Sequence, residues 1–115
     1  MSNLNGLTVR WSLVDAPADT ADRLRDYVEE PSHAKFTGKP GMRFKTWRMV
    51  PGQWFEGCYV FESDEARAAF QAEFTPNAPT APVSELTGAG PLFIEPCEVV
   101  AIAEGGAGFA TYARF

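Results

Sequence analysis

Residues 41–74 decide the fold that this sequence predicts: 41-GMRFKTWRMVPGQWFEGCYVFESDEARAAFQAEF-74. Met42–Val50 mixes aromatic, β-branched and long side chains without a helical period, and Pro51-Gly52 ends it. Trp54–Phe61 is almost wholly apolar, as is typical of a strand covered on both faces. Ser63 is a favourable N-cap for a following helix with one apolar face. The stretch therefore predicts a β-hairpin that leads directly into an amphipathic helix.

The chain on either side supplies the remaining elements of an α+β fold. Residues 4–14 alternate apolar and polar side chains and predict a strand, and residues 19–30 predict a helix that Pro31 ends. Residues 92–103 predict a last strand, in which Pro96 indicates an edge position or a bulge. The order β-α-β-β-α-β is ferredoxin-like: a four-stranded antiparallel sheet with two helices on one face. Because the other face also carries apolar residues, we expect a second copy of the chain to cover it as a homodimer.

Three segments fall outside this pattern. Residues 32–40 predict a loop that carries the only histidine, His33. Residues 75–91 contain four prolines and predict an irregular crossover with one helical turn near residues 83–86; such a segment is either a lid over a binding site or a solvent-exposed connection. Residues 105–115 form a Gly-rich joint and an aromatic tail, which packs on its own domain or crosses to another subunit.

Composition narrows the classes of function. A chain of 115 residues suits one domain, residues 1–115, and a net charge of −5 argues against nucleic acid or an anionic membrane as a partner. The absence of a signal peptide and of a membrane-spanning run predicts a cytoplasmic protein, with Cys58 and Cys97 as reduced core residues. No glycine motif for phosphate binding is present, and two cysteines with one histidine cannot close a zinc site. We therefore expect no cofactor.

The segment GMRFKTW (41–47), followed by GCYVF (57–61) and an acidic, Ala-rich helix, resembles the YdhR-like monooxygenase family. This family belongs to the dimeric α/β-barrel superfamily, which also contains the antibiotic-biosynthesis monooxygenases. The resemblance implies a homodimer whose two sheets face each other, with a pocket between sheet and helices in each subunit. Relatives oxidise polycyclic phenols to quinones with dioxygen and no added cofactor, and others bind haem. The chain departs from the family in its longer segments 32–40 and 75–91 and in its tail.

A candidate pocket follows from the pairing expected in the hairpin. A turn at Pro51-Gly52 pairs Arg48 with Phe55, Thr46 with Gly57, Phe44 with Tyr59 and Met42 with Phe61, although a slip of one residue would reverse the faces of one strand. In this register the paired residues face the helices, and Gly57 leaves space for a flat aromatic ligand. The predicted substrate-binding residues are Phe44, Thr46, Phe55, Gly57 and Phe61.

Three residues are candidates for catalysis. Tyr59 and Arg48 would bind a phenolate or carbonyl oxygen, where a cation favours the phenolate that reacts with dioxygen. His33 would remove the phenol proton, because an imidazole suits proton transfer near neutral pH. Each residue also has an ordinary structural explanation: a core tyrosine, a solvated surface arginine and an exposed loop histidine.

Three functions follow from these observations. The first is a cofactor-independent monooxygenase that oxidises an aromatic, phenolic or quinol-like small molecule. The second is a haem-binding or haem-degrading protein, with His33 as the only histidine able to ligate iron. The third is a non-catalytic module that holds a small apolar ligand, for example in a stress response. The fold alone does not choose among them, because function resides in the site.

Overall fold

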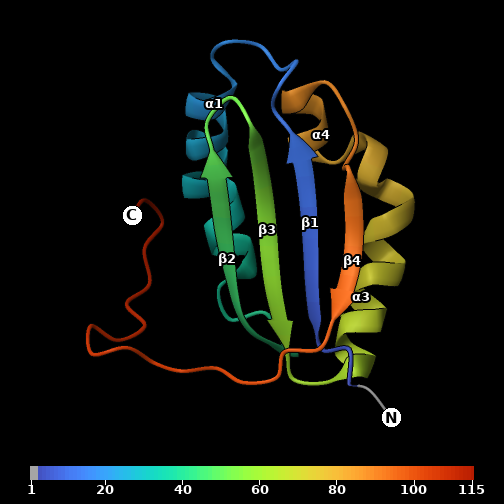
Figure 1. Cartoon of the computed structure of the whole chain (residues 1–115), viewed down its shortest axis with the longest axis vertical. Coiled ribbons are helices and arrows are strands. Elements are labelled where there is room, and N and C mark those ends of the chain that lie inside the picture. The colour runs from blue at the N-terminus through green and yellow to red at the C-terminus, as the bar shows by residue number, and fades with distance from the viewer. Residues whose placement is uncertain (1–2) are drawn as a thin grey trace.

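Four antiparallel strands form a single sheet in the order β2-β3-β1-β4 in the computed structural model, which describes residues 3–115 (Figure 1). The strands are β1 (Gly6–Ser12), β2 (Met42–Val50), β3 (Trp54–Phe61) and β4 (Phe93–Cys97). Helices α1 (Thr20–Tyr27), α2 (His33–Phe36), α3 (Asp64–Asn77) and α4 (Pro82–Thr87) cover one face of the sheet. The architecture confirms the predicted ferredoxin-like α+β fold.

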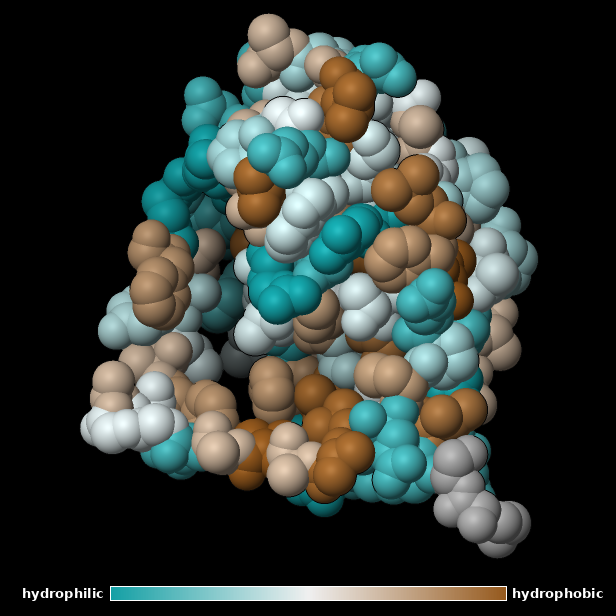
Figure 2. Space-filling model, viewed as in Figure 1, coloured by the Kyte–Doolittle hydropathy of each residue, from teal (hydrophilic) through white to brown (hydrophobic). Residues whose placement is uncertain are grey.

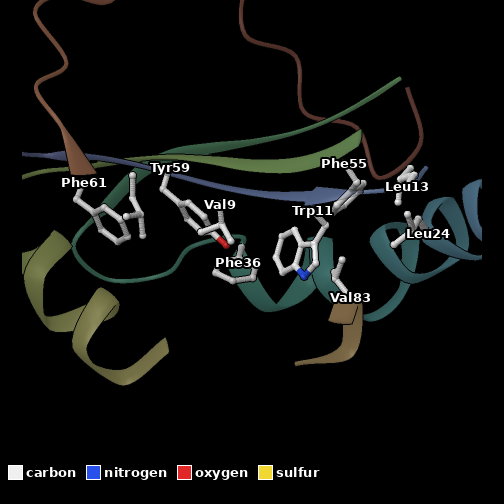
Figure 3. Packing of buried hydrophobic residues seen from close by; sticks show 10 residues of the cluster. Val9, Trp11, Leu13, Leu24, Phe36, Phe55, Tyr59, Phe61 and Val83 are labelled. Carbon is white, nitrogen blue, oxygen red and sulfur yellow. The ribbon is translucent and has the colours of Figure 1, made fainter. Parts of the chain in front are cut away.

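The core lies between the sheet and the helices (Figure 3). On the central strand β1, Leu7, Val9 and Trp11 are buried and alternate with more exposed neighbours, as the period of two predicts. The indole Nε1 of Trp11 donates a hydrogen bond to Ser84 Oγ (2.9 Å), and that hydroxyl donates to the carbonyl oxygen of Ala78 (2.6 Å). These bonds fix α4 against β1 and give the buried indole N–H and the buried Ser84 hydroxyl a partner each.

The hairpin register differs from the expected one by one residue. Gly52 has φ +77°, and the N–H of Gln53 donates to the carbonyl of Val50 (2.9 Å), so the loop contains three residues rather than two. The carbonyl of Gln53 accepts from Leu13 N–H (2.9 Å), which ties the loop to the end of β1. Val50 therefore pairs with Trp54, and the remaining pairs shift accordingly. The expected register was wrong over most of the hairpin.

A β-bulge limits the extent of this shift. The register of β2 against β3 changes between Met42 and Phe44, so that Met42 still pairs with Phe61 as expected. Beyond the bulge, Phe44 pairs with Val60 and Lys45 pairs with Tyr59. Because side chains alternate along a strand, the shift places Lys45, Trp47 and Met49 toward the helices and Phe44, Thr46 and Arg48 on the opposite face, here called the outer face.

The first helical region is more divided than the sequence predicts. The helix expected over residues 19–30 ends at Tyr27 and is followed by a wide turn, η1 (Val28–Ser32). Glu30 within this turn is extended (φ −156°, ψ 118°), because a residue before proline is pushed out of the helical region. Residues 33–36 then form α2, so the prediction of a loop over the whole of residues 32–40 was wrong at that point.

The second helical region follows the prediction closely. Ser63 caps α3, since its Oγ accepts a hydrogen bond from the N–H of Ala66 (3.1 Å). The helix runs to Asn77, three residues beyond Phe74. A short turn, η2 (Ala78–Thr80), leads to α4, which confirms the helical turn expected near residues 83–86.

The C-terminal part of the chain contains less strand than predicted. β4 ends at Cys97 rather than near residue 103, and it lies at the edge of the sheet, as Pro96 indicated. Residues 98–115 form no helix or strand; the segment passes below the sheet and rises beside β2 (Figure 1). The Phe109 ring stacks on Phe44 with ring centres 5.9 Å apart. The tail therefore contacts the outer face of its own sheet at this ring.

The two cysteines are free thiols, as expected. Cys58 is half-buried on β3, but Cys97 is exposed, so its expected place in the core was wrong. Within residues 3–115, no helix has both the length and the apolar character needed to cross a bilayer.

Candidate functional site

A cavity of about 350 Å³ lies between the inner face of the sheet and the helices. This volume is within the range of small-molecule sites, which are mostly apolar with a few polar groups. Much of its lining is aromatic: Trp11, Tyr27, Phe36, Trp47, Phe55, Tyr59, Phe70 and Phe74. Strands β1, β2 and β3 supply the floor, and residues of the helices and their connections supply the walls. The cavity therefore suits a flat aromatic ligand.

The side chain of Lys45 is enclosed by three aromatic rings at this cavity. Its Nζ lies 3.5 Å from the ring centre of Phe36, 4.4 Å from that of Tyr59 and 4.5 Å from that of Trp47. No carboxylate of residues 3–115 forms an ion pair with it. Ring faces attract a cation, so these contacts replace part of the water that an ammonium group loses on burial.

Burial shifts the proton equilibria of Lys45 and Tyr59. The pKa of Lys45 is lowered well below its usual value, first by burial and second by the charge of Lys35, which outweigh the opposing influence of Cys58. Burial also raises the pKa of Tyr59, whose side chain is 5% exposed. Lys45 therefore loses its proton more readily than a surface lysine does, and Tyr59 keeps its proton at neutral pH.

Gly57 provides the space into which these two side chains reach. A Cβ atom at Gly57 would lie 3.3 Å from Lys45 Cε, 3.3 Å from Tyr59 Oη and 3.2 Å from Tyr59 Cε1. Contacts this short would force the neighbouring side chains to move. Gly57 thus leaves the expected space beside its Cα atom, and the side chains of Lys45 and Tyr59 occupy that space.

The cavity is rich in positive charge. The sequence contains only three lysines, and all three, Lys35, Lys39 and Lys45, contribute to the lining. Glu73 is the only carboxylate among the lining residues. In a chain with a net charge of −5, this local excess of cations favours an anionic ligand or one that becomes anionic.

Of the eight residues expected at the site, five lie at or beside the cavity and three lie on the outer face of the sheet. Tyr59, Phe55 and Gly57 line the cavity. Phe61 is buried and stacks on Tyr59 with ring centres 6.0 Å apart, without lining the cavity. His33 lies in α2 beside the cavity, with its ring centre 5.8 Å from that of Trp47.

The other three expected residues, Phe44, Thr46 and Arg48, lie on the outer face. Their expected position beside Tyr59 was wrong, because the three-residue loop shifts the register by one. The residues that take their places are Lys45 and Trp47. A sequence-level signal for Lys45 was present in the grouping of all lysines within residues 35–45, and the alternative register would have placed it inside.

Arg48 instead belongs to an ionic cluster on the outer face. Glu56 is fully buried and accepts hydrogen bonds from Arg10 Nε (2.8 Å) and Arg48 Nε (2.7 Å). The Arg10 guanidinium also lies 4.1 Å from the ring centre of Trp54. Burial by itself would raise the pKa of Glu56, but the hydrogen bonds from the two arginines hold it below its usual value. This carboxylate is therefore ionised at neutral pH.

The potential of the site for metal binding is limited. Within residues 3–115, no group of three or more His, Cys, Asp or Glu side chains is arranged to hold a metal ion. The polar groups of the cavity lining are instead three amines, two phenols (Tyr27 and Tyr59), two hydroxyls, one amide and a single carboxylate. This set can exchange protons, bind an anion or act as an amine nucleophile.

The fold and cavity together define a ferredoxin-like α+β domain with an aromatic, lysine-containing cavity under its sheet. Among solved structures, it is similar to a protein of unknown function from Nitrosomonas europaea, with a TM-score of 0.58 and 20% sequence identity. The match covers 88% of this chain and 93% of that protein. No family model and no curated protein matches the sequence. The structural likeness supports the fold.

Proposed function

We propose that the chain is a cofactor-independent monooxygenase that binds a flat phenolic or quinol-like molecule in the cavity and oxidises it with dioxygen. The observation that carries this proposal is the Lys45 amine, enclosed by Phe36, Trp47 and Tyr59 at the floor of an aromatic cavity. The resemblance of residues 41–47 and 57–61 to the YdhR-like monooxygenases supports the same class of reaction.

Lys45 would perform the proton transfer that was expected of His33. As a neutral amine it would accept the phenol proton, and the resulting ammonium would pair with the phenolate. The lowered pKa of Lys45 makes its neutral amine more accessible than that of an exposed lysine at the same pH. Tyr59, which keeps its proton, would donate a hydrogen bond to a ligand oxygen.

The proposed reaction balances without another reductant. The phenol loses its O–H hydrogen and one ring C–H hydrogen and becomes a quinone, so the ring is oxidised by four electrons. Dioxygen accepts these electrons; one oxygen atom forms the new carbonyl and the other leaves as water with both hydrogens. In this mechanism the protein would contribute binding, deprotonation and charge stabilisation, and neither flavin nor metal takes part.

We also propose that the working form is a cytoplasmic homodimer in which a second copy covers the outer face. Phe44, Trp54 and Phe93 are only half-buried on that face, around the Arg10–Glu56–Arg48 cluster. Figure 2 shows this face with a hydrophilic patch across its middle and apolar residues around it. The helices cover the inner face of the sheet, and a partner that buries the apolar rim would cover the outer face.

The haem alternative has less support. His33 does not line the cavity, and its ring lies against Trp47 at an interplanar angle of 33°. Non-catalytic binding of an aromatic ligand is the alternative that the cavity itself permits.

Dioxygen uptake tests the proposal. Purified protein is supplied with naphthols, naphthohydroquinones and anthrones, with no added cofactor. We expect uptake that requires folded protein and is lost in Lys45→Met, whereas Arg43→Met retains it. Arg43 is a suitable control because it lies on the same strand and is exposed.

Two results would contradict the monooxygenase proposal. Equal uptake by Lys45→Met and the wild type would exclude the proposed role of Lys45. Tight binding of these phenols without turnover would instead support the non-catalytic module.

A further inference from the structure

We propose that the Lys45 amine is a nucleophile that condenses with the aldehyde or ketone group of an aromatic ligand and forms an imine in the cavity. The inference uses the same cavity as the proposed oxidation but does not depend on a reaction with dioxygen. It extends the ligand class from phenols to aromatic carbonyl compounds.

The environment of Lys45 is that of a reactive amine. A lysine becomes a nucleophile when it is desolvated in an apolar pocket or lies near another cation, and both conditions are met here. The three rings of Phe36, Trp47 and Tyr59 surround Nζ, and the charge of Lys35 disfavours a second cation nearby. Within residues 3–115 no carboxylate pairs with Lys45 to hold its proton in place.

The step balances as a condensation. Lys45 Nζ forms a bond to the carbonyl carbon and passes one of its two protons to the carbonyl oxygen. That oxygen takes a second proton from the Tyr59 hydroxyl or from solvent, and the C–O bond breaks with loss of water, which leaves a protonated imine. No electron is gained or lost overall. The protonated imine is again a cation at the position of Nζ, so the same ring faces that attract the ammonium would stabilise it.

Tyr59 is placed to assist the loss of water. Its hydroxyl and Lys45 Cε both lie 3.3 Å from the point that a Gly57 Cβ would occupy, so the two groups meet in the same gap. Burial keeps this hydroxyl protonated, and it can donate a proton to the departing oxygen. A phenylalanine at position 59 would retain the ring contact with Lys45 but remove the proton donor.

The three lysines differ in how far their amines are enclosed, so we expect imine formation to be selective for one of them. Lys35 is exposed and Lys39 is half-exposed near the ring of Phe70, with its Nζ 5.5 Å from the ring centre. Lys45 alone has its amine enclosed by three rings. The other two lysines therefore serve as internal controls in the same molecule.

Reductive trapping tests the inference. The folded protein is incubated with a limiting amount of naphthaldehyde and sodium cyanoborohydride, and the modified residue is located by peptide mass spectrometry. We expect one naphthylmethyl group, on Lys45. Each pKa unit below that of an exposed lysine raises the neutral fraction about tenfold, which favours Lys45 near neutral pH.

Three controls make the result decisive. Lys45→Met should lose the selective adduct while Lys35 and Lys39 react at their slow background rate. Protein unfolded in urea should lose the preference for position 45. Tyr59→Phe should form the adduct more slowly, because it lacks the proton donor.

The inference is overturned if the label is spread evenly over the lysines of the folded protein, or if Lys45 stays unmodified while Lys35 reacts. Trapping and dioxygen uptake are separate readouts. An adduct at Lys45 without phenol oxidation would support the imine and contradict the oxygenase, and the reverse result would do the opposite.

Discussion

Lys45 and Tyr59 are paired directly across β2 and β3, and the Lys45 Nζ lies 4.4 Å from the centre of the Tyr59 ring. The next inward-facing pair along the strands is Trp47 with Gly57. The absence of a side chain at Gly57 leaves room for both Lys45 and Tyr59. This local arrangement supports the proposed proton transfer and the proposed imine.

Gly57→Ala should reduce ligand binding, because its Cβ would lie 3.3 Å from both Lys45 Cε and Tyr59 Oη. Overpacking of this kind costs about 1–3 kcal/mol of stability. Fluorescence titration with a naphthol and urea denaturation measure the two effects. Gly105→Ala is the matched control, since nothing lies within 4 Å of the added Cβ. Equal affinity in both variants would show that the gap at Gly57 does not shape the site.

Lys45→Met should remove a pH-dependent part of the free energy of unfolding. The pKa of Lys45 is lowered in the folded protein, so the unfolded chain binds more protons between that value and the ordinary lysine pKa of about 10.4. Stability contributed by Lys45 therefore rises with pH in this window and is lowest below it. The non-titrating methionine variant lacks this rise.

Urea midpoints from about pH 7 to 9.5 measure this difference, below the range in which an unfolded tyrosine ionises. Lys35→Met is the control, because Lys35 is exposed. Parallel dependence on pH in the wild type and in Lys45→Met would contradict a lowered pKa of Lys45 in the folded protein.

Glu56→Leu should destabilise the fold by about 2–4 kcal/mol, because it leaves Arg10 and Arg48 without their shared carboxylate. The cost is below that of a fully buried pair, since the Arg48 side chain is 58% exposed. Because the pKa of Glu56 is lowered, its contribution is present at neutral pH and is lost as pH falls through the folded-state value.

Asp22→Asn is the comparison for Glu56, since it removes an exposed ion pair with Arg25 and should cost under about 1 kcal/mol. Urea denaturation at neutral and acidic pH gives both values. A wild-type advantage over Glu56→Leu that does not shrink in acid would contradict the ionic account.

Removal of residues 105–115 should leave the stability of the domain almost unchanged, within about 0.5 kcal/mol. The tail is largely exposed, and its polar contacts are the exposed ion pairs of Arg114 with Asp26 and Glu29.

The same truncation also tests the assembly state of the protein, which light scattering after gel filtration measures. If the tail crosses to a second copy, the truncated chain should dissociate at a higher concentration than the full chain does; an identical profile would exclude that role.

Much of the fold could be read from local patterns. Three of these patterns each act over a few residues: the alternation around Leu7, Val9 and Trp11, the N-cap at Ser63, and Pro96 in the last strand. These patterns are set by the backbone geometry of strands and helices, which neighbouring residues largely determine. They were sufficient for the element order and hence for the ferredoxin-like topology.

The identity of the site residues required the tertiary structure. Tyr59, Phe55 and Gly57 could be placed inside from the apolar character of β3, but the facing strand could not, because Met42–Val50 carries large side chains on both faces. One additional loop residue, Gln53, exchanged Arg48 for Lys45 beside Tyr59. The sequence alone thus determined the element order and the aromatic content of the core. Only the folded chain decided which cation enters that core, because cross-strand register also depends on hydrogen bonds between segments far apart in the sequence, such as the bond from the N–H of Leu13 to the carbonyl of Gln53.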